Sequence, residues 1–304
     1  MKTQSRLWRI VRWAPLAVML LVAAALGAML LLGGMTRVTA WYLLQIGPPV
    51  VGLIVLIAVV IYAIIRRRLS RGAILTGLVA LLCLSAAILM VAPQTYPASL
   101  ESTQPAATVR LPANVPLKVI WGGDTKKVNQ HVVVPDQRWA YDLLVEPYLT
   151  GSSELAAYGC YGVPVVAPAA GTVVQAHDGE PDMTPGVASN NYQAPEGNVV
   201  ALRLETGTYL LLAHLKPGSV RVKVGDLVAE GQEIGQCGNS GNTSEPHIHI
   251  HHQRQDPNLY PINFAEGLPL YFRDHDGPPM PEGGVRVENG MPVAVGATVR
   301  HVGK

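Results

Sequence analysis

The sequence predicts two parts of different kind: three N-terminal transmembrane α-helices, followed by an all-β, mainly antiparallel domain. Three observations indicate this. Residues 1–92 contain long apolar runs, nine Lys and Arg and no Asp or Glu. Residues 93–304 contain the other 14 basic residues and all 21 acidic ones, a formal charge of −7. This second part breaks into short β-rich runs separated by Gly and Pro, and it holds all nine histidines.

Three apolar runs, at about residues 14–35, 41–65 and 72–92, contain no charged side chain. Each has about 20 residues or slightly more, which is enough to cross ~30 Å of hydrocarbon. A long core helix of a soluble protein could account for one such run, but three of them within residues 1–92 favour a membrane anchor. Since no ionisable group lies inside a run, a transport pathway is not indicated.

Basic residues surround these runs unevenly. The N-terminal tail carries four, the turn at 66–71 carries four, and the turn between the first two runs carries only Arg37. Basic loops stay in the cytoplasm, so we expect a cytoplasmic N-terminus and an extracytoplasmic chain after residue 92. A cleaved signal peptide is disfavoured, because the first apolar run exceeds the usual length of about 7–15 residues.

The remaining chain divides by composition. Residues 93–107 are rich in Pro, Ser and Thr and are expected to form a linker. Residues 108–255 contain runs such as LKVIW, NVVALRL and YLLLAHL, several with period-two alternation, and predict a β-rich domain with its own core. Residues 256–304 form a Pro- and Gly-rich extension, in which Asn289-Gly290 predicts a hairpin.

Two features limit the range of functions. The outer part is acidic and shows no basic stripe with interleaved aromatic residues, which excludes nucleic-acid phosphates as expected partners. Cys160 and Cys237 would face an oxidising compartment, whereas Cys83 lies within an apolar run. Spacing alone leaves open whether Cys160 and Cys237 form a disulfide.

The stretch SEPHIHIHHQ contains four histidines in six positions. Strand alternation would place His247, His249 and His251 on one face and His252 on the other. Imidazole is the commonest protein ligand of transition metals, and a catalytic zinc site commonly has three protein ligands and one open position. Further candidate ligands lie elsewhere in the outer part: His131, Asp136, Asp142, His177 and His214.

Several segments together resemble a known family. In order, NQH…AYDLLV, LLLAHL and VKVGDLVAEGQEIGQCGNSGNTSEPHIHI are similar to the pattern of the lysostaphin-type zinc metallopeptidases, over roughly residues 117–255. The resemblance implies a β-sheet metallopeptidase domain that hydrolyses peptide bonds of bacterial cell-wall peptidoglycan with Zn²⁺ as cofactor. It implies metal ligands at His131, Asp142 and His249 and catalytic histidines at His214 and His247.

One departure leaves an alternative open. Ten residues separate His131 from Asp142, more than is usual in the family, so Asp136 is a rival ligand. We favour Asp142 because it opens the apolar strand DLLV, and a ligand on a strand is held more rigidly than one in a loop.

The chemistry of this residue set agrees with the resemblance. Two neutral imidazoles and one carboxylate leave Zn²⁺ net positive, so that it can activate water and polarise a carbonyl. Amide hydrolysis also needs a base and a donor to the developing oxyanion, and His214 and His247 can share these roles. The sequence does not decide which histidine does which.

Three other histidines are expected to take no part. His251 lies too far along the strand to reach the metal, and His252 lies on the opposite face. Changes at both positions are expected to be mild. His177 precedes the turn signal Asp178-Gly179 and is expected to be a surface residue.

Two other functions were weighed. A non-catalytic, wall-binding regulator of other cell-wall hydrolases could use the same fold, but all five positions of the family pattern are filled here. A biotinyl- or lipoyl-type carrier would need a Lys at a hairpin tip, and the corresponding turn, RLETGTYL, has none. The expected protein is therefore a multi-pass enzyme of the bacterial cytoplasmic membrane. Its partners are the lipid bilayer, peptidoglycan peptides and a possible regulatory protein of unknown identity.

Overall fold

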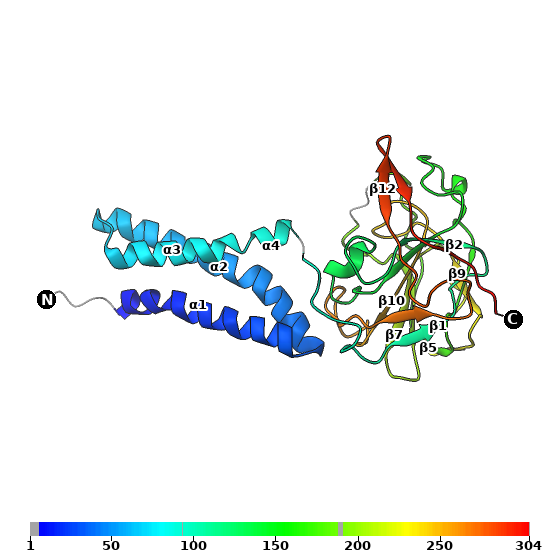
Figure 1. The fold of residues 1–304 in the computed structure, drawn as a ribbon, viewed down its shortest axis with the longest axis horizontal. Helices are drawn as coiled ribbons and strands as arrows, with labels where there is room; N and C mark the ends of the chain where they lie inside the picture. The colour runs from blue at the N-terminus through cyan, green and yellow to red at the C-terminus, as the bar shows by residue number, and fades with distance from the viewer. Residues whose placement is uncertain (1–5, 93, 188–190, 304) are drawn as a thin grey trace. The chain divides into compact units, whose positions relative to one another are not determined.

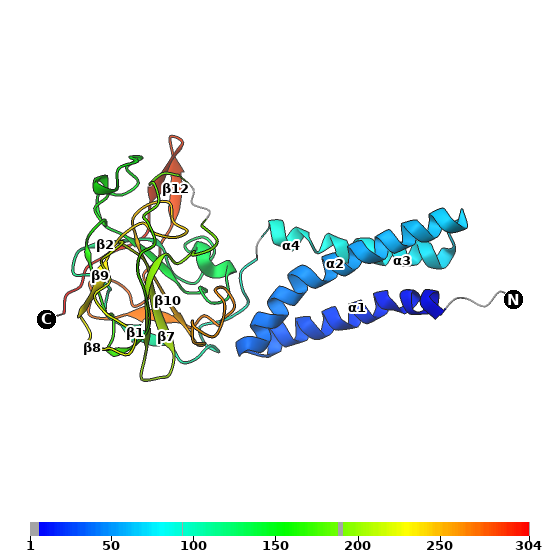
Figure 2. The ribbon, with the colours of Figure 1, turned by 180° about the vertical axis from the view of Figure 1, so that it is seen from behind.

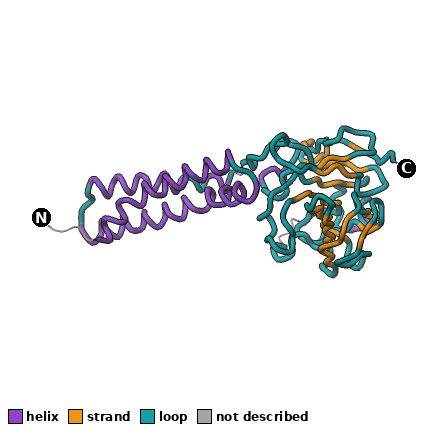
Figure 3. The backbone as a smooth tube through the Cα atoms, turned by 90° about the horizontal axis from the view of Figure 1, so that it is seen from below, coloured by secondary structure: helices purple, strands orange, loops and turns teal. Residues whose placement is uncertain are grey.

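The computed structural model describes residues 6–92, 94–187 and 191–303, and the chain divides into two compact units, residues 1–97 and 98–304. Figures 1 and 2 show the ribbon from opposite sides. In Figure 3 the colours separate a helical first unit from a second unit built from strands and loops. The two units are described one after the other.

The first unit consists of helices that lie side by side (Figure 1). At Gly33 and Gly34, the latter with φ of +63°, the chain reverses after the first helix. Ser70 begins the third helix, where its Oγ accepts a hydrogen bond from the backbone N–H of Ala73 at 3.1 Å. The helices are α1 (Arg6–Leu31), α2 (Gly34–Arg66), α3 (Arg71–Ser85) and the short α4 (Ile88–Val91).

One described helix, Gly34–Arg66, is long and apolar enough to cross a membrane. The apolar stretches Leu16–Leu31 and Arg71–Ser85 are shorter. At about 1.5 Å per residue, the stretch Arg71–Ser85 extends roughly 22 Å, against ~30 Å of hydrocarbon. The third run is shortened because its helix stops at Ser85 before α4 begins. This corrects the expectation of three full-length spans at about 14–35, 41–65 and 72–92, since one helix meets the length.

The two ends of α2 differ in how their basic residues are used. Arg37 is buried, and its Nε donates to the carbonyls of Met29 and Leu32 at 3.1 and 3.0 Å. It thereby satisfies carbonyl groups at the C-terminal end of α1. At the other end, Arg66 and Arg71 frame a turn whose arginines are all exposed. Among the basic residues of the helical unit whose side chains the structure describes, the exposed ones all lie at the α2–α3 turn.

The second unit is built on an eight-stranded antiparallel sheet. The strand register shifts at three of its pairings, β2 with β3, β5 with β6, and β6 with β7. In spatial order the strands are β14 (Thr298–Val299), β2 (Leu117–Trp121), β3 (Tyr141–Leu144), β10 (Ile248–Gln253), β7 (Tyr209–Leu215), β6 (Asn198–Arg203), β5 (Gly171–His177) and β8 (Leu227–Val228). The antiparallel β-rich character predicted from the sequence is confirmed.

Three smaller strand pairs and two 3₁₀ turns complete this unit. The pairs are β1 (Ala107–Val109) with β11 (Leu270–Phe272), which is parallel, and the antiparallel pairs β4 (Pro164–Val166) with β9 (Glu233–Gln236) and β12 (Val285–Glu288) with β13 (Met291–Ala294). The turns are η1 (Gln130–Val133) and η2 (Leu155–Ala157). Strand β1 begins within the segment expected as a linker, and the C-terminal extension supplies β11 to β14.

The core lies on one face of the large sheet. On β10, Ile248 and Ile250 are fully buried, and they belong to one cluster with Leu143 of β3 and Leu212 of β7. Because neighbours on a strand point to opposite faces, His249 and His251, which alternate with these isoleucines, point away from this cluster. Asp142, the cross-strand partner of His249, therefore lies with His249 and His251 on the face of the sheet away from this cluster.

A disulfide joins Cys160 to Cys237, with a Cα–Cα distance of 5.8 Å. The sequence left this pairing open, and the structure decides it. The bond links the segment after η2 to the residue that follows β9, across 77 positions of sequence. It therefore anchors the start of the loop that leads to the histidine-rich strand.

Candidate metal centre

Three adjacent strands in the middle of the sheet carry the candidate site. The register places His249 of β10 directly opposite Asp142 of β3 and Ala213 of β7. The next residue along β7 is His214. Residues more than a hundred positions apart in sequence are therefore brought together by hydrogen-bonded strands rather than by loops, which limits their freedom to separate.

His131, Asp142 and His249 converge on one point. Asp142 Oδ2 lies 2.9 Å from His131 Nε2, and Asp142 Oδ1 lies 2.8 Å from His249 Nδ1. One potential ligand atom from each residue lies within 4.8 Å of the others. Two imidazole nitrogens and one carboxylate oxygen are ligands that suit Zn²⁺, and three protein ligands leave the fourth position of a catalytic site open. The residues present therefore fit a zinc ion.

A buried asparagine holds His131 in place. His131 lies on η1, and the Oδ1 atom of Asn129 accepts a hydrogen bond from its backbone N–H at 3.0 Å. The Nδ2 group of Asn129 donates to the carbonyls of Gly123 and Ala140 at 2.9 and 3.2 Å. Since Asn129 is fully buried, it ties this turn to the segment that enters β3. The sequence reasoning did not single out Asn129.

The charge state of the cluster also suits a cation. Burial alone would raise the pKa of the Asp142 carboxyl, but His131 and His247 outweigh it and hold this pKa well below its usual range. Burial lowers the pKa of His249, although Asp142 partly opposes the shift. Near neutral pH, the site therefore offers an ionised carboxylate beside an imidazole whose nitrogen is free to bind a metal.

A second group of three overlaps the first. Ligand atoms of His214, His247 and His249 also lie within 4.8 Å of one another. The ring centroid of His214 lies 4.7 Å from that of His247 and 5.7 Å from that of His249. All five residues that the family pattern singles out therefore lie in one cluster, with His249 common to both groups.

His214 adopts a backbone conformation that few non-glycine residues use. Its φ is +61°, and its backbone N–H donates to the Glu196 carbonyl at 2.9 Å. The Nδ1–H group donates to the Ser240 carbonyl at 2.8 Å, which leaves Nε2 without a proton in the neutral ring. Burial, with His247 and His249 nearby, holds the pKa of His214 well below its ordinary value. His214 is thus a neutral base or hydrogen-bond acceptor.

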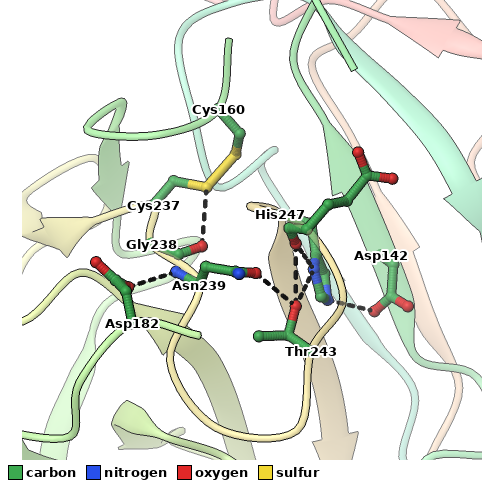
Figure 4. Close-up of a disulfide and its surroundings, with 9 residues drawn as sticks. Asp142, Cys160, Asp182, Cys237, Gly238, Asn239, Thr243 and His247 are labelled. Carbon is green, nitrogen blue, oxygen red and sulfur yellow. Dashed lines mark hydrogen bonds and ion pairs between the residues drawn. A yellow bond between two sulfur atoms is a disulfide. The ribbon is translucent and has the colours of Figure 1, made fainter. Parts of the chain in front are cut away.

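His247 is oriented by the loop before β10 (Figure 4). Its Nδ1 lies 2.8 Å from the Glu245 carbonyl, which can only accept, so Nδ1 carries the proton. The Thr243 hydroxyl lies 3.2 Å from the same nitrogen and donates to Asn239 Oδ1 at 3.0 Å. The Nε2 atom lies 3.5 Å from Asp142 Oδ1. Burial lowers the pKa of His247, but Asp142 and the Glu245 carbonyl outweigh it, and the net shift is upward.

Two glycines allow the loops that carry these contacts to approach. Gly197 has φ of +61°, and a Cβ there would lie 2.4 Å from Ser240 atoms. Gly241 has φ of +88°, and a Cβ there would lie 2.4 Å from the Gly197 nitrogen. A side chain at either position would push apart the segments that supply the Glu196 and Ser240 carbonyls to His214.

The cluster lies in a cleft of about 450 Å³. The walls come from β2, the turn around η1, the loop near Pro195 and the loop before β10. Tyr192, Glu196, Glu245 and Asn263 are among the residues that line it. A volume of this order suits a short stretch of peptide or a similar ligand.

The remaining candidates lie elsewhere or differ in role. Asp136 is buried and accepts a hydrogen bond from the Asn263 backbone, but it does not line this cleft. His177 is exposed at the end of β5, 3.4 Å from Glu180. His252 points to the opposite face of β10, between the Pro269 carbonyl and the Thr208 hydroxyl. His251 contacts His249 directly, which the sequence reasoning missed.

A comparison with protein-family models identifies residues 155–261 as matching peptidase family M23. The matched segment includes His214, His247 and His249 and begins after His131 and Asp142. The resemblance to lysostaphin-type peptidases inferred from the sequence is thereby confirmed for this part of the chain.

Solved structures that match part of this chain include three peptidases. Lysostaphin from Staphylococcus simulans is 22% identical over 50% of this chain and 47% of its own, with a TM-score of 0.32. A putative peptidase M23 from Pseudomonas aeruginosa is 20% identical over 48% and 44%, with a TM-score of 0.29. A zinc-containing peptidase from Vibrio cholerae is 21% identical over 47% and 37%, also with a TM-score of 0.29. These likenesses are weak, so the case for function depends on this chain's own side chains.

Proposed function

We propose that this chain, which carries a segment of peptidase family M23, is a membrane-anchored zinc metalloendopeptidase that hydrolyses peptide bonds of cell-wall peptidoglycan. The observation that carries the proposal is the meeting of His131, Asp142, His214, His247 and His249 in one cleft. Their segments come from four separate parts of the sequence. An accidental meeting of four buried or half-buried imidazoles around a carboxylate would be costly, because buried polar groups need partners.

For the metal we favour His131, Asp142 and His249 as ligands. This group contains the carboxylate, and Asp142 contacts both imidazoles at hydrogen-bond distance, at 2.9 and 2.8 Å. A carboxylate balances part of the charge of Zn²⁺ in a buried site, which three neutral imidazoles would not do. The remaining histidines, His214 and His247, then lie beside the metal rather than on it.

These two histidines would handle the protons of amide hydrolysis. When bound, zinc would activate water and polarise the scissile carbonyl. Both Nδ1–H groups are committed to backbone carbonyls, so proton transfer at either ring takes place at Nε2. Neutral His214 has no proton there and can accept one, whereas His247 has an Nε2–H to donate when its ring is protonated. The pKa of His214 is lowered, which favours the neutral ring and a role as proton acceptor. The pKa of His247 is raised, which favours the protonated ring and a role as donor to the developing negative charge.

The helical unit would serve as the anchor. Helix α2 is apolar over a membrane-spanning length, and α1 and α3 lie against it. We propose three passes, with local thinning of the bilayer compensating for the shorter apolar stretches. The exposed arginines between α2 and α3 favour a cytoplasmic position for that turn and an extracytoplasmic position for the β unit, where peptidoglycan lies.

The test is digestion of purified peptidoglycan by the full chain in detergent, with mass spectrometry of the new peptide termini. We expect new amino and carboxyl termini, loss of cleavage with a chelator, and recovery on adding zinc. Undiminished cleavage by metal-free protein would contradict the zinc mechanism. Wall binding without new termini would instead support the alternative, a non-catalytic regulator of other hydrolases.

A further inference from the structure

Three side chains form a continuous row along the polar face of β10. His249, His251 and Gln253 are spaced by two residues, and all are at least 95% buried. His249 Nε2 lies 3.0 Å from His251 Nδ1, and His251 Nε2 lies 3.1 Å from Gln253 Oε1. The Gln253 amide Nε2 lies 2.7 Å from the Gln255 carbonyl oxygen.

The last of these groups sets the direction of every hydrogen bond in the row. A backbone carbonyl only accepts, so Gln253 must present its NH₂ group to Gln255 and its oxygen to His251. An amide oxygen also only accepts, so the proton of His251 lies on Nε2. The Nδ1 atom of neutral His251 is then an acceptor and receives the Nε2–H of His249. Gln253 thus fixes the tautomer of His251, and His251 in turn fixes the tautomer of His249.

This order has a consequence at the metal end of the row. With its proton on Nε2, neutral His249 presents an Nδ1 lone pair to Asp142 Oδ1, 2.8 Å away. Two lone pairs face each other across this contact, and a cation between them converts repulsion into attraction. The row ends in an acceptor on both sides, the Gln255 carbonyl and the Asp142 carboxylate. In the neutral state both imidazole N–H groups point toward Gln253, so no N–H of the row is left to donate to Asp142.

We propose that His251 and Gln253 are positioning residues that hold His249 as the Nε2–H tautomer and aim its Nδ1 at the metal. The inference rests on the proposed function only through His249 as a zinc ligand. Histidine ligands usually donate their second N–H to a carboxylate, a backbone carbonyl or water. Here a second histidine takes that place. A change at position 251 is therefore not mild, in contrast to the expectation from strand spacing.

The test uses the full chain in detergent and compares zinc dissociation constants by competition with a chromophoric chelator. His251→Leu keeps much of the volume but removes the acceptor. His251→Asn restores an acceptor near the Nδ1 position. Gln253→Leu removes the group that directs His251. His252→Asn is the matched control, since His252 is equally buried on the opposite face of the same strand. Near-ultraviolet circular dichroism establishes that each variant is folded.

We expect His251→Leu and Gln253→Leu to weaken zinc binding by about 10–100-fold, and His251→Asn and His252→Asn to stay within ~3-fold of the unaltered chain. Wild-type affinity in folded His251→Leu would overturn the inference while leaving the proposed function intact. Affinity of His251→Asn as poor as that of His251→Leu would overturn the acceptor role. If the unaltered chain binds no zinc, or if His249→Ala binds it equally well, the proposed function and this inference both fail. Should His251→Leu not fold, Gln253→Leu gives the decision.

Discussion

Asp142 and His249 are direct cross-strand partners, and the carboxylate Oδ1 of the first lies 2.8 Å from the imidazole Nδ1 of the second. Strand pairing therefore sets the separation of two proposed ligands. The third, His131, comes from a short turn that Asn129 ties down. Loss of one side chain should consequently leave the positions of the others nearly unchanged, so single substitutions can separate metal binding from catalysis.

The first prediction distinguishes the proposed role of His249, as a metal ligand, from that of His247, as a catalytic residue. His249→Ala should lose both zinc and activity, because it removes a ligand. His247→Ala should keep nearly one zinc per chain and lose about 10²–10⁴-fold in rate, the usual contribution of a positioned acid or base. Zinc content by atomic absorption and turnover on a wall peptide distinguish the two.

The matched control is His252→Ala, which removes an imidazole from the opposite face of the same strand and should keep both properties in folded protein. Loss of zinc in both His247→Ala and His249→Ala would assign the metal to the group formed with His214. Zinc lost in His247→Ala and kept in His249→Ala would refute both groups, and with them our choice of ligands.

The second prediction concerns where the outer unit can be cut free. A fragment of residues 98–304 should fold and bind zinc, since the structural boundary lies at 97/98. A fragment of residues 110–304 should be less stable, because it lacks β1, which pairs with β11 along Ala107–Val109. Urea unfolding of both fragments provides the comparison. Equal midpoints would mean that β1 contributes nothing to the fold.

The third prediction concerns the disulfide. Replacing Cys160 and Cys237 by Ala should lower the free energy of unfolding by about 2–4 kcal/mol, because the bond restricts a long loop in the unfolded chain. Cys83→Ala, in the helical unit, is the control and should leave the outer unit unchanged. Urea titration of the purified proteins measures the difference. A double variant as stable as the control would exclude a stabilising role for the bond.

The fourth prediction tests the topology. A cysteine placed at Ser70, in the exposed basic turn, should be labelled by a membrane-impermeant reagent only after the cells are opened. A periplasmic-type reporter fused after Pro97 should be active. Both follow from the concentration of exposed arginines in the α2–α3 turn. Labelling of Ser70→Cys in intact cells would reverse the assigned orientation.

The sequence predicted the strand-rich outer unit through its period-two runs, and its resemblance to the lysostaphin-type pattern singled out the five residues that meet in the cluster. Alternation in IHIHH assigned faces to the β10 histidines, and the structure has His252 on the opposite face from His251. The lengths of the helices were less predictable, since hydropathy does not reveal that α3 stops at Ser85 or that α2 begins at Gly34.

The supporting residues were not predictable from one sequence. Asn129, Thr243 and Ser240 act through hydrogen bonds whose partners are fixed only by tertiary structure. The contact between His251 and His249 shows the limit of strand spacing as an argument. Two residues on one face can be too far apart to share a metal ion and still close enough for their rings to share a hydrogen bond.

The last prediction uses His252, whose pKa is lowered to about 4 by burial and by Arg254, against an opposing hydrogen bond to the Pro269 carbonyl. An unfolded histidine takes up its proton near pH ~6.5, whereas folded His252 does so only near the lower value. Between the two, the unfolded chain binds more protons, so the free energy of unfolding falls as pH is lowered. The full loss from this one group is about 3 kcal/mol.

The control for this prediction is His252→Asn, which can still donate to the Pro269 carbonyl but does not titrate. Urea unfolding of both proteins at several pH values from 7 to 4, with chelator present so that metal release does not contribute, isolates His252. Other groups titrate equally in both proteins and cancel in the difference. The stability of the unaltered chain should fall more steeply below pH ~6.5 than that of the variant. Parallel curves would mean that His252 is not held neutral between Pro269 and Thr208.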